Sequence, residues 1–157
     1  MRYARMIGCV VVALLLVSTL PYAAGAAAIR VKPHKFNPCK ARDGNNHVMP
    51  VYIQGDGGQA QHYALVNLPV GRTITKLTLF YSGPGTDLTT ATLNRVRLGE
   101  QFQLVAAINA ISNTGTDVWS IQQTSIDRPL IESGFTYYVW VEAGTNARVW
   151  GVKINYE

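Results

Sequence analysis

The residues TITKLTLFYSGPGTDLTTATLNRVRL, Thr73–Leu98, contain the pattern that decides the fold class. Two runs rich in Thr, Leu, Ile and Val, Thr73–Tyr81 and Leu88–Leu98, flank the cluster Ser82–Asp87. Gly, Pro and Asp in that cluster supply the backbone angles of a turn. No window here or elsewhere in the chain offers a convincing apolar face with helical period. The stretch therefore predicts two β-strands joined by a turn.

The same pattern recurs along most of the chain, with turn clusters such as Gly55–Gly58 and Ser112–Gly115 between the apolar runs. The predicted strands are Val51–Gln54, His62–Asn67, Thr73–Tyr81, Leu88–Leu98, Gln101–Ala110, Asp117–Ile126, Phe135–Glu142 and Ala147–Tyr156. About eight strands at this spacing favour an all-β fold, an antiparallel β-sandwich of jelly-roll type.

The first 28 residues have the features of a secretory signal peptide. Arg2 and Arg5 precede an unbroken apolar run, Ile7–Val17, and small residues follow it. The run is short for a membrane-spanning helix, which needs about 20 apolar residues. Cleavage after Ala26 or after Ala28 satisfies the small-x-small rule equally well. We expect an exported protein that is secreted, periplasmic or at the cell surface, with no transmembrane segment after cleavage.

Cysteine usage is consistent with a core that holds without disulfides. Cys9 precedes most of the apolar run, which does not suit a lipoprotein cysteine, and it would leave with the signal peptide. Cys39 then remains alone, so no intramolecular disulfide can form. We interpret Cys39 as an unpaired structural thiol, with an intermolecular bridge and a reactive group as the alternatives.

Positive charge is concentrated near the start of the exported chain. The full sequence has 14 basic and 9 acidic residues, and removing Arg2 and Arg5 leaves 12 basic residues and a charge of +3. Five of the 12 lie between Arg30 and Arg42, and the sequence from Asp43 onward carries −2. A folded domain that is slightly acidic argues against nucleic-acid binding, which needs basic residues spread over a folded face among aromatic side chains.

Residues 29–47 are predicted to form a basic N-terminal arm, and residues 48–157 the β-sandwich domain. The stretch Ile29–Pro50 contains three prolines, Pro33, Pro38 and Pro50, and a polar turn cluster, Asp43–Asn46, without a sustained period. Such an arm could remain solvated, contact an anionic envelope polymer, or mediate self-association with a neighbouring subunit.

Four segments resemble a family of small, uncharacterised exported bacterial proteins. They are VNLPVGRTITKLTLFY (Val66–Tyr81), TATLNRVRL (Thr90–Leu98), YYVWVEA (Tyr137–Ala143) and VWGVKINY (Val149–Tyr156). The shared features are an LPxGxxI motif that begins a long strand and a GVxIxY motif at the chain end. The resemblance implies a β-sandwich outside the cytoplasm and no assigned activity, so it identifies no functional residue.

Motifs for metal binding and catalysis are missing from the sequence. His34, His47 and His62 stand singly, with neither an HxH nor a CxxC pair, and the GDGG turn offers one carboxylate where a calcium loop needs several oxygen ligands. No serine lies in a GxSxG motif. Six acidic residues could still meet in space as a glycosidase pair: Asp87, Glu100, Asp117, Asp127, Glu132 and Glu142. We predict no catalytic residue, no metal and no cofactor.

The last two predicted strands suggest a hairpin with two different faces. If Ala143–Asn146 is the loop, Glu142 lies opposite Ala147. The face predicted to enter the core carries Phe135, Tyr137, Val139, Val141, Arg148, Trp150, Val152 and Ile154, with Tyr156 following. The outer face carries Tyr138 and Trp140, with Gly151 opposite Tyr138 and with Lys153 and Asn155 nearby.

Exposed aromatic rings beside polar groups are what a sugar-binding sheet needs. We therefore predict a ligand-binding site with Tyr138 and Trp140 as the platform and Lys153 and Asn155 as polar partners. The competing interpretation is structural, because an aromatic ring opposite a glycine often covers bare backbone, as Tyr138 would cover Gly151. Burial of the same patch against another subunit is a further alternative.

Three classes of function remain from the sequence. The first is a secreted, non-enzymatic domain that binds carbohydrate or a cell-envelope polymer. The second is a structural subunit of a homo-oligomeric surface assembly or filament that adds strands at an open sheet edge. The third is a glycan-active hydrolase.

Overall fold

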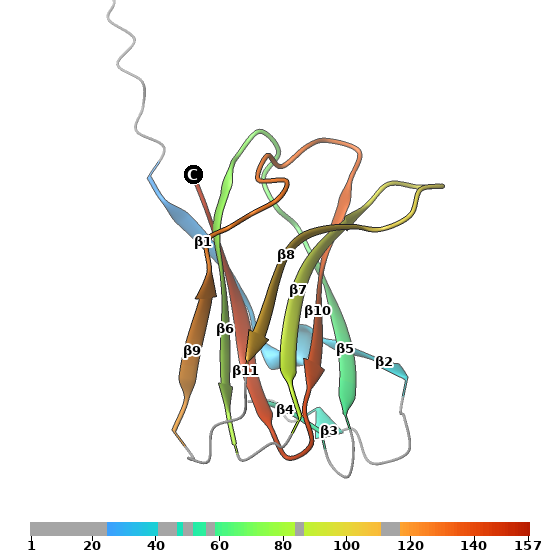
Figure 1. The fold of residues 1–157 in the computed structure, drawn as a ribbon. Coiled ribbons are helices and arrows are strands. Elements are labelled where there is room, and N and C mark those ends of the chain that lie inside the picture. Colours follow the sequence, from blue (N-terminus) through green and yellow to red (C-terminus); the bar gives the residue numbers. More distant parts are fainter. Residues whose placement is uncertain (1–24, 41–46, 49–51, 56–58, 84–86, 111–116) are drawn as a thin grey trace, which may run out of the picture.

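The chain forms a two-layer β-sandwich in a computed structural model (Figure 1). The structure describes residues 25–40, 47–48, 52–55, 59–83, 87–110 and 117–157. In these residues eleven strands and one 3-10 turn, η1 (Pro33–Lys35), make up the regular structure. No helix among them is long and apolar enough to cross a membrane. The predicted all-β, antiparallel β-sandwich is confirmed.

Six strands form one sheet, in the order β3-β4-β11-β6-β9, with β1 also paired to β11. Their bounds are β1 Ala27–Val31, β3 His47–Val48, β4 Ile53–Gln54, β6 Ile74–Ser82, β9 Trp119–Gln123 and β11 Arg148–Tyr156. The second sheet has the order β2-β5-β10-β7-β8. Its strands are β2 Asn37–Lys40, β5 Ala60–Val66, β7 Thr89–Val96, β8 Gln103–Ala110 and β10 Thr136–Ala143.

The strands pair in a nested order that defines a jelly roll. β7 pairs with β8, and outward from this central pair β6 pairs with β9, β5 with β10 and β4 with β11. Among these eight strands, neighbours in the chain therefore fall into opposite sheets, except for β7 and β8. All eight predicted strands overlap the eight strands of this nest.

The core lies between the sheets and is filled by alternate residues of the long strands. Leu77 and Leu79 of β6 and Val139 and Val141 of β10 are fully buried. From β7, Leu93 enters the same layer, and Ile154 enters it from β11. Tyr137 is buried too, and Phe135 and Tyr156 pack against the core while half-buried.

The prediction of a loosely ordered arm over residues 29–47 is wrong. β1 pairs with β11 over its full length, from Ala27 opposite Tyr156 to Val31 opposite Val152. β2 pairs with β5 at the edge of the other sheet. Val31 and Phe36 are buried in the core, so the sandwich begins before residue 29. Residues 41–46, which include the predicted Asp43–Asn46 turn, lie outside the described part of the chain.

The signal peptide stays a prediction, because residues 1–24 lie outside the described part. β1 does distinguish the two candidate cleavage sites structurally. Cleavage after Ala26 leaves β1 complete, whereas cleavage after Ala28 removes its first two residues and their pairing with Tyr156 and Asn155. The side chain of Cys39 also lies outside the described residues.

One histidine makes stability depend on pH. His62 is fully buried, on the core side of β5, and this burial lowers the pKa of its imidazole, while a weaker contact with the Ala60 backbone opposes the shift. The unfolded chain takes up a proton near the ordinary histidine pKa of about 6.5, and the folded state resists it. The contribution of neutral His62 is therefore complete above that pH and is lost as the pH falls below it.

We expect the urea concentration at the midpoint of unfolding to decrease when the pH is lowered from about 7 to about 5. His62→Gln should remove part of that decrease. His34→Gln is the matched control, because it makes the same substitution at an exposed position outside the core. Equal slopes for the parent and the His62 variant would contradict the assignment.

Candidate functional site

β10 occupies the middle of the five-stranded sheet and presents two different faces. Tyr137, Val139 and Val141 are buried in the core, and Tyr138 and Trp140 point outward and are half-buried. The predicted division of this strand into a core face and an outer face is confirmed. Its outer residues therefore lie on a broad surface, with two strands on either side.

The predicted hairpin between the last two strands is wrong, because β10 and β11 belong to different sheets. The actual partners of Trp140 are Tyr63 on β5 and Thr92 on β7. Those of Tyr138 are Leu65 and Asn94. The segment that joins β10 to β11 crosses between the layers, so it cannot serve as a tight hairpin loop.

Consequently the structure does not unite the four predicted site residues. Lys153 and Asn155 lie on β11, opposite Arg30 and Ala28 of β1, in the other sheet. The Oδ1 atom of Asn155 is buried and has no hydrogen-bond partner among the described residues. Tyr138 and Trp140 remain together, while Lys153 and Asn155 cannot be their polar partners.

A third aromatic residue joins Tyr138 and Trp140. Tyr63 lies directly opposite Trp140 in the register and is half-buried on the outer side of β5. We call Tyr63, Tyr138 and Trp140 the aromatic platform. The sequence did carry a signal for Tyr63, since it alternates with the core residues His62 and Ala64 in a predicted strand. Only knowledge of the β5–β10 pairing places it beside Trp140.

Hydrogen-bonding groups border the platform on both sides. The Nε2 atom of Gln61 donates to Oε1 of Glu142 at 3.4 Å, two residues along the strands from the Tyr63–Trp140 pair. Nδ2 of Asn94 donates to Oγ1 of Thr92 at 2.8 Å on β7. The Tyr138 hydroxyl, like that of any tyrosine, is protonated at neutral pH and can donate, and burial raises its pKa further. The surface thus combines aromatic rings with donors and acceptors.

The glycine-covering role predicted as an alternative for Tyr138 is excluded by the register. None of the five strands of this sheet contains a glycine. Gly151 instead lies opposite Phe80 of β6, in the other sheet. The aromatic platform is therefore not explained by bare backbone beneath it.

Trp150, predicted to lie in the core, points outward. A β-bulge between Val149 and Gly151 shifts the alternation of β11, so that Val149 and Val152 are both buried. Nε1 of Trp150 donates to Oγ of Ser82 at 2.7 Å, and its ring lies 5.4 Å from that of Tyr52. Arg148 does not enter the core either, because its guanidinium lies over Tyr52, 4.9 Å from the ring centre.

Three of the six candidate acidic side chains have structural partners. Asp87 accepts a hydrogen bond from Oγ1 of Thr145 at 2.6 Å. Glu132 forms an ion pair with Arg95, and Glu100 pairs with Arg97 at 3.6 Å. Within the described residues no group of three or more His, Cys, Asp or Glu side chains could hold a metal ion.

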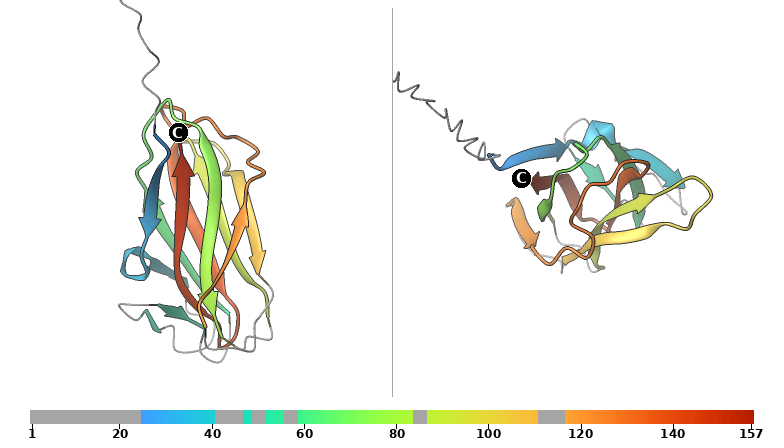
Figure 2. Two further views of the ribbon diagram at one scale, coloured as in Figure 1. Left: turned by 90° about the vertical axis from the view of Figure 1, so that its left-hand side faces the viewer. Right: turned by 90° about the horizontal axis from the view of Figure 1, so that it is seen from above.

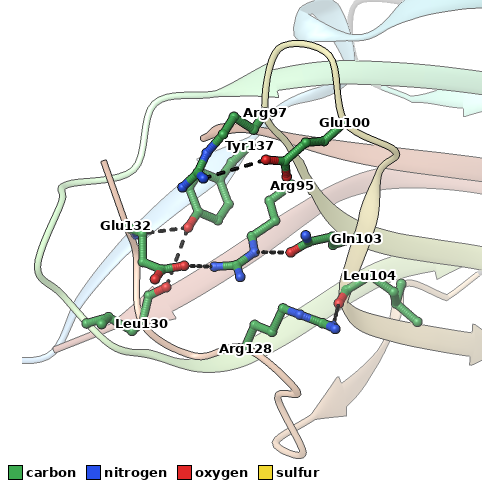
Figure 3. A network of polar contacts seen from close by, with 9 residues as sticks. All are labelled: Arg95, Arg97, Glu100, Gln103, Leu104, Arg128, Leu130, Glu132 and Tyr137. Carbon is green, nitrogen blue, oxygen red and sulfur yellow. Dashed lines mark hydrogen bonds and ion pairs between the residues drawn. The ribbon is translucent and has the colours of Figure 1, made fainter. Parts of the chain in front are cut away.

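At one end of the sandwich, a network of polar contacts holds the loop before β10 to residues of β7 and β8 (Figure 3). Arg95 donates from Nε to Gln103 at 2.9 Å and pairs with Glu132. The Tyr137 hydroxyl accepts from the backbone N–H of Glu132 at 3.1 Å. Beside this network, residues including Leu65, Val70 and Phe135 line a hollow of about 360 Å³. Because the charged groups satisfy one another, we assign the network to structure.

Comparisons with known proteins identify the fold. No protein-family model matches the chain, and no curated protein matches it. The C-terminal CBM6 of LamC, a marine laminarinase from Zobellia galactanivorans, superposes with a TM-score of 0.52 at 7% identity, covering 82% of this chain and 98% of that one.

Two further matches have lower scores. The CBM35 of Cellvibrio japonicus Abf62 has a TM-score of 0.49 at 13% identity, covering 82% of this chain and 92% of that one. The carbohydrate-binding module CBM6cm-2 from Cellvibrio mixtus lichenase 5A has 0.46 at 11% identity, covering 81% and 95%. At such identities the likeness to the LamC module shows a shared fold alone.

Proposed function

We propose that this protein is an exported, non-enzymatic domain that binds carbohydrate through the aromatic platform. The observation that carries the proposal is the placement of Tyr63, Tyr138 and Trp140. They lie on the outer side of two adjacent central strands, in a sheet without glycine. In the described part of the chain, these three half-buried rings form no ring–ring or cation–π contact.

The chemistry of the platform suits a sugar chain. The C–H face of a pyranose is apolar and packs on an aromatic ring, while its hydroxyls need donors and acceptors at the border. Gln61 and Glu142 supply these on one side, and Thr92 and Asn94 on the other. Rings held on strands lose little conformational freedom on binding, which favours affinity.

The fold supports the same class of function. A module of LamC with this fold is a carbohydrate-binding module of a laminarinase, although fold similarity by itself does not establish function. The ligand, in our proposal, is a polysaccharide or another glycan of the cell envelope. An export route through the signal peptide would bring the domain to such polymers.

A hydrolytic function has weaker support, because catalysis of glycosidic cleavage needs two carboxyl groups facing one substrate. Glu132 and Glu100 are paired with arginines, and Asp87 with Thr145. Glu142 lies next to the platform, and its hydrogen bond from Gln61 gives it a binding role.

The assembly hypothesis has lost its main support. It combined a free basic arm with an open sheet edge, but β1 and β2 pair within their own chain. The open edge strands are the part of the hypothesis that remains.

Trp140→Ala is expected to weaken glycan binding about 30-fold, because truncating a central aromatic contact costs about 2 kcal/mol. The parent is first screened against a panel of soluble polysaccharides by affinity electrophoresis, and dissociation constants are then measured by calorimetry. Tyr63→Ala should weaken binding as well.

Trp119→Ala is the matched control, since Trp119 is 51% exposed on β9 in the other sheet. This variant should bind like the parent. Thermal unfolding of every variant shows whether it is folded at the assay temperature. A parent that binds no glycan in the panel, or a Trp140 variant with unchanged affinity, would refute the proposal.

A further inference from the structure

A groove of about 360 Å³ lies on the outer side of the six-stranded sheet, far from the aromatic platform in the fold. β1 and β4 share one edge of β11: β1 pairs with Val152–Tyr156, and β4 pairs with Arg148 and Val149. Figure 2 shows these two strands one above the other along that edge. The bulge of β11 lies between the segment that pairs with β1 and the segment that pairs with β4, and the groove forms over this bulge.

The floor of the groove is aromatic and apolar. Trp150 and Phe80 line it, together with Val118, which is 52% exposed. The hydrogen bond from Trp150 to Ser82 and the contact with Tyr52 fix the indole in place. Trp150 is half-buried and lines the groove together with Gly151 and Phe80, its register partner.

The rim of the groove is basic. Arg30 and Lys32 line it directly and are exposed. Lys153 lies opposite Arg30 in the register of β1 and β11, and no ion pair within the described residues involves any of the three. Like charges directly opposite one another in a sheet are unfavourable, and a bound anion would relieve this repulsion.

The whole sheet shares this imbalance of charge. Its strands contain four basic residues, Arg30, Lys76, Arg148 and Lys153, and no Asp or Glu. The five-stranded sheet, by contrast, has Glu142 beside its aromatic platform. The two outer faces of the sandwich therefore differ in the ligands that they favour.

We propose that this groove is a second binding site, specific for an acidic polysaccharide whose sugars carry carboxylates. Trp150 would stack on a sugar ring, and the guanidinium of Arg30 would bind a carboxylate through two parallel hydrogen bonds. Lys32 and Lys153 would add charge attraction along the chain. The site is independent of the aromatic platform, so each can fail without the other.

A sugar chain fits these features better than a nucleic acid does. The groove has one outward-facing indole at its floor, which suits a ring that stacks beside its own carboxylate. Binding of single-stranded nucleic acid commonly uses successive aromatic residues along a longer basic channel. Single-stranded DNA is therefore included in the test as a competitor of matched charge.

The test measures binding of the full exported chain to polygalacturonate, dextran sulfate, neutral dextran and oligo-dT. We expect polygalacturonate to bind most tightly, with an affinity that falls as salt is raised. Arg30→Gln should weaken that binding about tenfold, as expected for the loss of one charge-assisted contact. Arg72→Gln is the matched control, since Arg72 lies in the β5–β6 connection and does not line the groove.

Each other outcome overturns the proposal in a distinct way. Equal losses for Arg30→Gln and Arg72→Gln would show a general charge effect. Tighter binding of dextran sulfate or oligo-dT than of polygalacturonate would show that carboxylated sugars are not the ligand. Loss of polygalacturonate binding in Trp140→Ala, with Arg30→Gln unaffected, would move the acidic chain to the aromatic platform. If Arg30→Gln loses polygalacturonate but still binds a neutral glycan, the aromatic platform remains functional. The outcome for the groove can then be told apart from the outcome for the proposed function.

Discussion

Replacing Gly151 by alanine is expected to lower the free energy of unfolding by about 3 kcal/mol. Gly151 has φ of 139°, a conformation that L-residues rarely adopt, and this strain accounts for part of the loss. An added Cβ would also lie 2.7 Å from the backbone oxygen of Val31. Backbone cannot rotate away as a side chain can, so β1 would have to move off β11. For a chain of this size the melting temperature should fall by roughly 12 °C.

Gly99→Ala is the control that separates strain from the clash. Gly99 has φ of 83°, and nothing lies within 4 Å of a Cβ placed on it. Its substitution should cost only about 1 kcal/mol. Hydrogen exchange of residues 27–31 gives a second measurement, because these amides should exchange faster in Gly151→Ala and not in Gly99→Ala. Equal costs for the two variants would mean that the contact between Val31 and Gly151 does not hold β1 in place.

The strands and their core faces could be predicted from sequence because alternation is a local property. Val139 and Val141 enter the core and Tyr138 and Trp140 point outward, as the period of two requires. The prediction needed no knowledge of which strands pair. The prediction of eight strands also agrees with the eight strands, β4–β11, that pair in the nested order.

Pairing could not be obtained in the same way, because a jelly roll joins strands that are distant in the chain. The nested order of a jelly roll places β10 and β11 in different sheets. The hairpin predicted for these two strands is therefore inconsistent with the predicted fold class. The crossing segment is held to both layers: Gly144 N–H donates to Oγ1 of Thr89, and Asn146 N–H donates to the oxygen of Gly55. The aromatic platform depends on this pairing, and Tyr63 was missed for that reason.

The bulge and the N-terminal strands escaped detection for different physical reasons. Trp150 was assigned to the core because strict alternation was extended through Gly151, although a glycine inside a strand often marks a bulge. β1 and β2 are short, each contains a basic residue, and β2 contains Pro38, all of which are typical of a solvated arm. Pro38 is compatible with a strand because β2 lies at a sheet edge, where one amide need not be paired.

Arg95→Met is expected to lower the free energy of unfolding by about 3 kcal/mol. The Arg95 side chain is 10% exposed, and it combines a hydrogen bond to Gln103 with an ion pair to Glu132. Its guanidinium also lies over Phe135, 4.1 Å from the ring centre. Methionine retains the apolar stem and removes all three polar interactions. Most of the lost free energy comes from the interactions of Arg95 itself. Glu132 adds little, because its side chain is 43% exposed and is hydrated again when its partner is removed.

Arg97→Met is a close control, because Arg97 lies over the same ring at 4.3 Å and pairs with Glu100. Arg97 is half-exposed, however, and solvent-exposed ion pairs contribute only about 0 to 1 kcal/mol. Urea unfolding should therefore separate the two variants by about 2 kcal/mol at an unchanged m-value. The difference isolates burial as the cause, since residue type, substitution and aromatic partner are the same. If both variants lose the same small amount, the network of Arg95 is a surface feature and does not anchor the loop before β10.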